Sequence, residues 1–177
     1  MNTKTLVSLS LLTGIGAVLH AVIPGVFLGM KPDMMLTMMF LGIILFPNKK
    51  NVLLLGILTG VISGLTTQFP GGFVPNLIDK PVTAFLFYGL YLLTQKYSHS
   101  ILGASVLTAV GTIISGTVFL LSAFFLVGLP GAFVALFAAV VLPATIVNAG
   151  AMFVVYPIIT SVLKRTTISE AVTENAS

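Results

Sequence analysis

The amino-acid sequence predicts an all-α integral membrane protein, a bundle of six transmembrane helices with both termini in the cytoplasm. Of its 177 residues, 57% are hydrophobic and only 7% are charged, whereas a soluble domain of this size carries about 25% charged residues. The apolar residues gather in six uncharged stretches, without the alternating ten-residue segments of a membrane barrel. Helix is the expected form, because backbone groups in lipid must be satisfied within their own segment. We expect one transmembrane domain over residues 1–165 and a polar, disordered cytoplasmic tail over 166–177.

Turn-forming residues divide the stretches in chain order. Pro24-Gly25 follows the first, Pro47-Asn48 the second, Pro70-Gly71-Gly72 the third and Pro130-Gly131 the fifth. Proline fixes φ and lacks a donor, and glycine allows positive φ, so these pairs mark loops. The expected helices are Leu6–Ile23, Met34–Phe46, Val52–Phe69, Pro81–Gln95, Ile101–Leu129 and Ala132–Leu163.

Two of these stretches differ in length from the roughly 20 residues that cross a bilayer. Met34–Phe46 is short and is compatible with a tilted, partly re-entrant helix. Ala132–Leu163 is long and contains Pro143 and Pro157, so it is expected to kink or to extend beyond the membrane. The count of six helices is therefore kept, with five as the alternative.

The orientation follows from the basic residues, which concentrate in the cytoplasmic loops of membrane proteins. With six spans, the side that holds both termini carries six Lys and Arg residues: Lys4, Lys49, Lys50, Lys96, Lys164 and Arg165. The other side carries only Lys31 and Lys80. This imbalance predicts cytoplasmic termini.

Small residues predict close helix packing at two places. The first helix contains Ala17 and Ala21 four residues apart, with Thr13 one turn earlier on the same face. Gly60 to Gly64 and Thr112 to Gly116 are similar five-residue runs in the third and fifth helices. Small residues at such spacings let another helix approach, either in this chain or in a partner.

Most polar residues fall toward the outer side of this topology, as a capture site for an extracellular small molecule requires. They are His20 near the end of the first helix, Lys31, Asp33, Asn76, Asp79 and Lys80 in outer loops, and Asn148 near the middle of the sixth helix. Each also has a structural interpretation. The charged residues can mark helix ends at the headgroup level, Asp79 can cap a helix that starts with Pro81, and His20 can bond a nearby carbonyl. Asn148 has the stronger functional interpretation, because polar groups in lipid usually face a cavity.

Several function classes lack their motifs. The sequence contains none of the motifs GxxxxGK[ST], HExxH and GxSxG, and it has two histidines and no cysteine. We therefore predict no ATP hydrolysis, no enzymatic activity and no metal site. No pair of acids is expected at membrane depth, which argues against a proton relay. The net charge of +4 is spread along the chain without a basic stripe, so nucleic acid is not an expected partner. No cofactor is expected, and lipid is the expected surrounding.

Three short motifs carry a family resemblance over roughly residues 1–165. Met30-Lys31-Pro32-Asp33-Met34-Met35, Leu45-Phe46-Pro47 and Pro75-Asn76-Leu77-Ile78-Asp79-Lys80-Pro81 resemble the tryptophan transport protein family, a substrate-binding S-component of energy-coupling factor (ECF) transporters. The resemblance implies binding of tryptophan near the outer face, and an ECF scaffold with two ATPases as partners. It places Ala17 and Ala21 at the interface with that scaffold.

The resemblance also suggests how a tryptophan zwitterion is held. Its ammonium group needs an acceptor, for which Asp79 and Asp33 are candidates, and its carboxylate needs a donor, for which Lys80, Lys31 and Asn76 are candidates. Asn148 or His20 is expected to meet the indole N–H. The expected apolar walls are Phe85, Tyr88 and the methionines at 30, 34, 35, 38 and 39.

Two further functions stay open. A self-sufficient secondary amino-acid transporter usually has an inverted repeat and an acid buried in the membrane, and neither is evident in the sequence. A non-transport accessory membrane protein accounts for the hydrophobicity but leaves the outward polar residues without a role.

Overall fold

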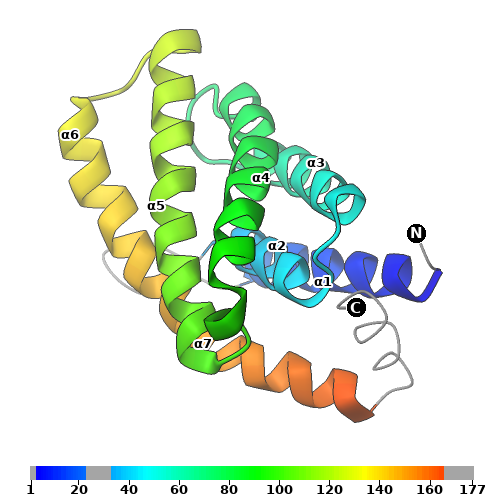
Figure 1. Ribbon diagram of the computed structural model, residues 1–177. Coiled ribbons are helices and arrows are strands. Elements are labelled where there is room, and N and C mark those ends of the chain that lie inside the picture. The colour runs from blue at the N-terminus through cyan, green and yellow to red at the C-terminus, as the bar shows by residue number, and fades with distance from the viewer. Residues whose placement is uncertain (1–2, 23–32, 166–177) are drawn as a thin grey trace.

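The computed structural model describes residues 3–22 and 33–165, and within these ranges every regular element is a helix. The first four are α1 (Thr3–Val22), α2 (Met34–Leu45), α3 (Lys49–Leu65) and α4 (Phe73–Ser98). They are followed by α5 (Ile101–Leu126), α6 (Phe133–Leu136), the π-helical turn η1 (Phe137–Val141) and α7 (Leu142–Arg165). Because α6, η1 and α7 continue one another, the path has the six expected helices (Figure 1). The predicted tail at 166–177 lies outside the described residues.

Four of the described helices are long and apolar enough to cross a membrane. They are α1, α4, α5 and the continuous helix Phe133–Leu163. The other two are shorter, since α2 has 12 residues and α3 has 17. At 1.5 Å per residue, α2 is about 18 Å long, well under the roughly 30 Å of a hydrocarbon core. A bundle with several apolar helices is thus established, and the full set of six spans stays a prediction.

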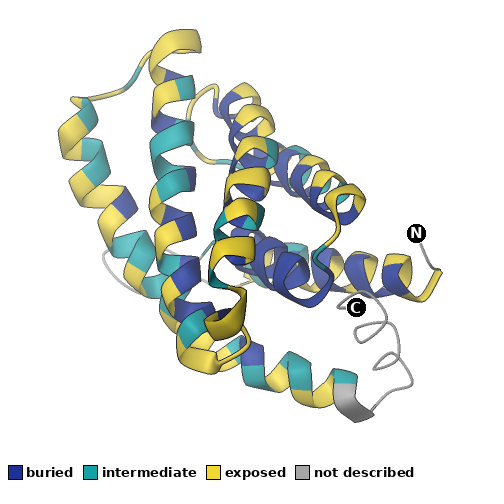
Figure 2. Cartoon of the chain, viewed as in Figure 1, coloured by how far each residue is buried: buried dark blue, intermediate teal, exposed yellow. Residues whose placement is uncertain are grey.

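The core lies around α2, whose 12 residues are all buried (Figure 2). Its neighbours are α1, α3, α4, α5 and α7. Inside this core the rings of Phe40 and Phe87 stack with centroids 4.0 Å apart. The other long helices bury only one face and expose apolar side chains outward. That distribution is the one expected when lipid covers the outside and protein surrounds the shortest helix.

Glycines allow the closest helix contacts, as the small-residue runs predicted. A Cβ on Gly56 would lie 2.8 Å from Pro81 Cα, and one on Gly60 would lie 3.1 Å from the carbonyl oxygen of Asn76. A Cβ on Gly116 would lie 2.5 Å from Val141 Cγ1. These contacts join α3 to α4 and α5 to η1. Thr13 of the first helix is buried within the bundle, and its Oγ1 donates to Leu9 O.

The fourth helix begins at Phe73 and not at Pro81, which corrects the predicted boundary. The turn before it contains Gly71 with φ of 68°. Pro75 lies in the first turn, where a missing N–H leaves no helical bond unmade, and the helix continues through Pro81. Asn76, Asp79 and Lys80 therefore lie inside a helix and not in a loop, and Asp79 is not a helix cap.

The last helix is irregular where proline predicted a kink. The N–H of Leu142 bonds to Phe137 O, five residues earlier, which makes one π turn immediately before Pro143. Proline cannot donate and its ring crowds the carbonyl four residues earlier, and a wider turn accommodates both effects. This turn places Val140 and Val141 on the wall of the cavity described next.

Candidate functional site

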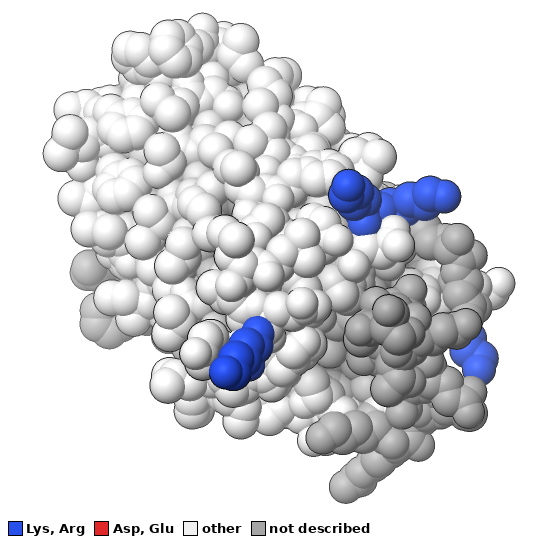
Figure 3. Space-filling model, in the orientation of Figure 1, with Lys and Arg blue, Asp and Glu red and all other residues white. Residues whose placement is uncertain are grey.

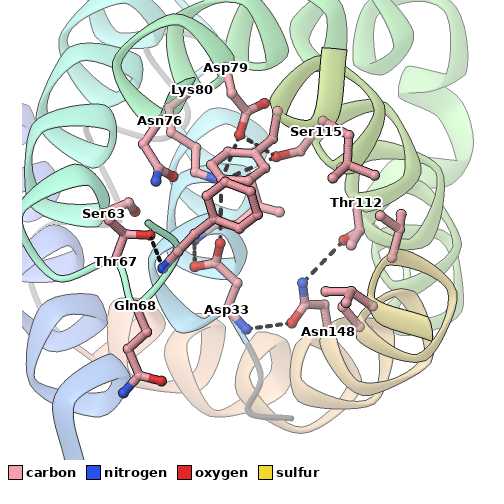
Figure 4. A pocket seen from close by; sticks show the side chains of 18 of the residues that line it. Asp33, Ser63, Thr67, Gln68, Asn76, Asp79, Lys80, Thr112, Ser115 and Asn148 are labelled. Atoms are coloured by element: carbon pink, nitrogen blue, oxygen red, sulfur yellow. Dashed lines mark hydrogen bonds and ion pairs between the residues drawn. The ribbon is translucent and has the colours of Figure 1, made fainter. Parts of the chain in front are cut away.

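A cavity of about 380 Å³ opens between α3, α4, α5 and the η1–α7 region, with Asp33 and Leu36 of the α2 end at its base. Small-molecule sites occupy roughly 300–1,000 Å³ and combine apolar walls with a few placed polar groups. This cavity has both, as Figure 4 shows for the polar side chains. The polar residues that line it are His20, Asp33, Ser63, Thr66, Thr67, Gln68, Asn76, Asp79, Lys80, Thr112, Ser115 and Asn148.

The charged centre of the cavity is formed by Lys80 between two carboxylates (Figure 4). Lys80 Nζ lies 2.9 Å from Asp79 Oδ2 and 3.3 Å from Asp33 Oδ2. Ser115 Oγ donates to Asp79 Oδ2 at 2.8 Å, and Thr83 Oγ1 donates to Asp79 Oδ1 at 2.7 Å. With two acids and one lysine, this cluster carries a charge of −1 in addition to whatever His20 contributes. Such an arrangement can bind an ammonium group and a carboxylate side by side.

The two acids differ in accessibility. Asp79 is fully buried, whereas the Asp33 side chain is 27% exposed. Asp33 caps α2, because its Oδ1 accepts the N–H of Leu36 at 3.0 Å. His20 Nδ1 from the end of α1 lies 3.7 Å from the same oxygen. Asp33 is therefore the acid that an entering ligand can reach.

Burial works to raise the pKa of Asp33, but its neighbours more than offset that effect. Lys80, His20 and the Leu36 N–H favour the charged carboxylate, so the pKa lies below its ordinary value of 3.8. Asp33 is thus negatively charged at neutral pH and available to a cation.

Asn148 fixes the backbone of the site. Its Oδ1 accepts the N–H of Asp33 at 2.7 Å, and its Nδ2 lies 3.4 Å from Thr112 Oγ1. The side chain is buried, with 1% exposed. Asn148 therefore links α7 to the N-terminus of α2 and to α5, across the floor of the cavity.

Aromatic and aliphatic side chains form the rest of the wall. Phe69 and Phe119 line the cavity and meet edge to face, with ring centroids 5.2 Å apart. Leu36, Leu120 and Val141 complete the apolar surface. An aromatic ligand would find both a ring partner and an aliphatic surface here.

The structure brings six of the seven predicted binding residues to this one cavity. These are His20, Asp33, Asn76, Asp79, Lys80 and Asn148. Lys31 lies outside the described residues. The predicted walls were wrong: Phe85 is exposed on the outside of α4, and Tyr88 and the described methionines Met34, Met35, Met38 and Met39 pack in or beside the core and not along the cavity. Apolar residues are too numerous in this chain for sequence alone to select the wall.

The structure also brings two acids together, whereas their depth in the membrane stays a prediction. Asp79 lies within α4, a helix long enough to span, and Asp33 meets it through Lys80. Asp79 was expected in a loop because the predicted fourth helix began too late, at Pro81. Asp33, which caps α2, does lie outside the helices. Most of the face drawn in Figure 3 is uncharged, with a few Lys or Arg side chains and no acidic side chain in view among the described residues.

Hydroxyl-bearing residues of the site, chiefly Ser63, Thr112 and Ser115, were not predicted from the sequence. Serine and threonine in membrane helices commonly bond to their own backbone, so their presence alone carries little signal. Ser115 lies in the small-residue run of α5, which the analysis used only for packing. In the described part of the chain, no three His, Cys, Asp or Glu residues are grouped so that they could hold a metal ion.

The predicted docking residues lie on α1. Ala17 is half-buried and Ala21 is exposed. The interface of these residues with a partner protein stays a prediction.

Comparisons with known proteins agree on one family. The family model described as "Tryptophan transporter TrpP" matches residues 2–164. A Bacillus subtilis protein named "Probable tryptophan transport protein" is 58% identical over 97% of this chain and 99% of its own length. Proteins of the same name from Clostridium acetobutylicum and Clostridium perfringens are 46% and 38% identical, over 84% and 94% of this chain and 87% and 97% of their own lengths. No solved structure matches the chain.

Proposed function

Because the chain belongs to the TrpP tryptophan transporter family, we propose that it captures tryptophan in the cavity around Lys80. Membership makes it a multi-pass membrane transport protein and not an enzyme. The observation that carries the proposal is the ion cluster of Asp33, Lys80 and Asp79 in an otherwise apolar cavity. A free amino acid carries an ammonium group and a carboxylate, and these can replace Lys80 and Asp33 as ion-pair partners in this cluster.

The exchange preserves charge balance. The ligand ammonium replaces Lys80 as the partner of Asp33, and the ligand carboxylate replaces Asp33 as a partner of Lys80. Asp79 stays in place, since it is fully buried and bonded to Thr83 and Ser115. The longer and more exposed of the two ion pairs, Lys80 to Asp33 at 3.3 Å, is the one that opens. Charges on the ligand are thus compensated without leaving a buried ion unpaired.

The side chain of tryptophan fits the remaining wall. Its indole ring can lie against Phe69 and Phe119, where an aromatic pair adds about 0.5–1.5 kcal/mol beyond the area it buries. Leu120 and Val141 supply aliphatic contact on the same wall. The cavity volume of about 380 Å³ suits one ligand of this size.

Ligand fluorescence provides the test, because the chain itself contains no tryptophan. The purified protein should shift and enhance the emission of L-tryptophan at one site per chain. Asp33→Asn should weaken binding by about tenfold or more, since a hydrogen bond to a charged group contributes about 1.5–3 kcal/mol. Lys96→Gln, at an exposed lysine near the end of α4, is the matched control and should leave binding unchanged. A folded protein that does not bind L-tryptophan would refute the proposal.

We further propose that the protein works as the S-component of an ECF-type importer. Two features support this proposal: the chain has no phosphate-binding loop of its own, and α1 presents Ala21 on its surface. Uptake into cells should then require a scaffold and ATPases. Ala21→Leu should abolish uptake while tryptophan binding persists. Gly89→Leu, a slightly larger addition at an open position on α4, should affect neither.

Self-sufficient secondary transport is the competing mechanism, and buried Asp79 is the observation that favours it. A proton carrier must release and regain its charge, however, and Asp79 is held by a lysine and two hydroxyl groups. Reconstitution of the purified chain alone into vesicles separates the two mechanisms. Tryptophan accumulation driven by an ion gradient would establish secondary transport, and its absence together with ATP-dependent uptake in the assembled complex would establish the ECF mechanism.

A further inference from the structure

One buried hydroxyl group on the cavity wall has no partner. Ser63 of α3 lines the cavity and is 5% exposed, and its Oγ makes no hydrogen bond with any described residue. Many other helical hydroxyls in this chain bond to the carbonyl four residues earlier. Thr66 does so on the same helix, and Thr112 does so on α5. Ser63 therefore lacks the intrahelical hydrogen bond of these residues, and it is a residue of the cavity wall.

An unbonded buried hydroxyl is unfavourable, so the position calls for a partner that the protein does not supply. Ser63 lies one helical turn beyond Gly60, where an added Cβ would lie 3.4 Å from Lys80 Cβ. It is thus near the charged centre but one turn away along α3. Figure 4 shows Ser63 beside Thr67 and Asn76, on the opposite side of the charged centre from Asn148 and Thr112.

We infer that Ser63 Oγ accepts the indole N–H of the bound ligand and thereby selects indole over other aromatic rings. This inference rests on the proposed function, in which the charged cluster holds the amino and carboxylate groups. The indole nitrogen is then the only polar group left on the ligand, and it can only donate. Ser63 offers an acceptor on the wall of the same cavity, one helical turn along α3 from Gly60.

Asn148, which the sequence analysis expected to meet the indole, is already engaged. Its Oδ1 accepts the N–H of Asp33 and its Nδ2 faces Thr112. Thr66 is engaged with its own helix, and Thr67 Oγ1 accepts the N–H of Phe69. Among the hydroxyl groups that line the cavity, Ser63 is the buried one whose bonding capacity is unused by the described residues.

A comparison of two ligands with two variants tests the inference. The ligands are L-tryptophan and 3-benzothienyl-L-alanine, in which a sulfur atom replaces the indole N–H at nearly the same size. The variants are Ser63→Ala and, as the matched control, Thr5→Val, which removes another unpartnered buried hydroxyl on α1, away from the cavity. Calorimetric titration of the full-length protein in detergent gives the affinity of each combination.

The wild-type protein should bind L-tryptophan about tenfold more tightly than the sulfur analogue, a factor typical of one buried hydrogen bond. Ser63→Ala should weaken L-tryptophan by a similar factor and leave the analogue unchanged, so that the preference disappears. Thr5→Val should keep the preference. The thermal stability of unliganded Ser63→Ala should not fall, because the hydroxyl has no bond to lose.

The possible failures are separable. If the wild-type protein binds both ligands equally, or if Ser63→Ala retains the preference, the role of Ser63 is overturned while tryptophan capture stands. If Ser63→Ala binds both ligands more weakly by the same factor, Ser63 supports the shape of the cavity and does not bond to the indole N–H. If the wild-type protein binds neither ligand, both the proposed function and the role of Ser63 are refuted.

Discussion

Removing the Lys80 side chain charge is the perturbation with the largest expected effect on stability. At 2.9 Å and 3.3 Å from two carboxylates, the lysine gains about 6 and 5 kcal/mol of gross Coulomb energy at an effective dielectric constant of about 20. Desolvation of the buried ions costs several kcal/mol each, so the net gain is much smaller. Losing one partner of a buried pair still costs about 3–5 kcal/mol, since the other charge stays buried. We expect this loss for Lys80→Met.

By the size scaling of protein domains, the corresponding fall in melting temperature is about 6–20 °C. Thermal unfolding in detergent, followed by circular dichroism, measures it. Lys96→Met removes an exposed lysine near the end of the same helix and should change the melting temperature little.

A second substitution tests whether charge compensation is the cause. Asp79→Asn added to Lys80→Met returns the cluster to its original charge of −1 and keeps an oxygen that accepts from Thr83 or Ser115. The double variant should therefore be more stable than the sum of the two single losses predicts, by about 1–3 kcal/mol. Strict additivity would refute the reasoning, because it would mean that the two side chains stabilise the fold independently.

Three other predictions follow from the geometry. Asn148→Ala should cost about 1–3 kcal/mol of stability and weaken tryptophan binding, because the Asp33 N–H loses its acceptor. The control in thermal unfolding is Thr145→Ala, since the Thr145 hydroxyl bonds to Val141 O in the preceding turn. Because the folded-state pKa of Asp33 lies below 3.8, its contribution should be full above about pH 4 and lost as the pH falls through that lowered pKa. The melting-temperature difference between wild type and Asp33→Asn should thus shrink as the pH falls below about 4. A difference that stays unchanged at lower pH would contradict the assignment. Gly56→Val should destabilise the bundle by about 1–3 kcal/mol because its Cβ would press on Pro81 Cα at 2.8 Å, whereas Gly89→Val, at an open position, should be tolerated.

The helices were predictable because composition and turn residues act locally. Pro70-Gly71-Gly72 lies at the real turn before α4, with Gly71 at positive φ. The boundary at Pro81 was wrong because three polar residues before it were interpreted as a loop. In the structure Asp79 and Lys80 pair with each other and with Asp33 and Ser115, and that long-range compensation cannot be seen in a local segment.

The site was predictable to the extent that its residues are rare in membrane segments. Charged and amide side chains at apolar positions stand out, and six of those chosen line one cavity. Ser63, Phe69 and Phe119 belong to residue types that are common in this chain, so only the three-dimensional arrangement distinguishes them. Selecting a wall residue requires knowing which face of its helix turns inward, and that depends on neighbours far away in the sequence.

The complete enclosure of α2 has a consequence for how the chain enters the membrane. A segment of 12 residues is too short to be held by lipid alone, and in the folded protein none of its residues faces outward. The enclosure of α2 is therefore complete only when α1, α3, α4, α5 and α7 are all in place. We expect this helix to settle late in biogenesis, so that substitutions along it lower the yield of inserted protein more than they lower the stability of molecules already assembled.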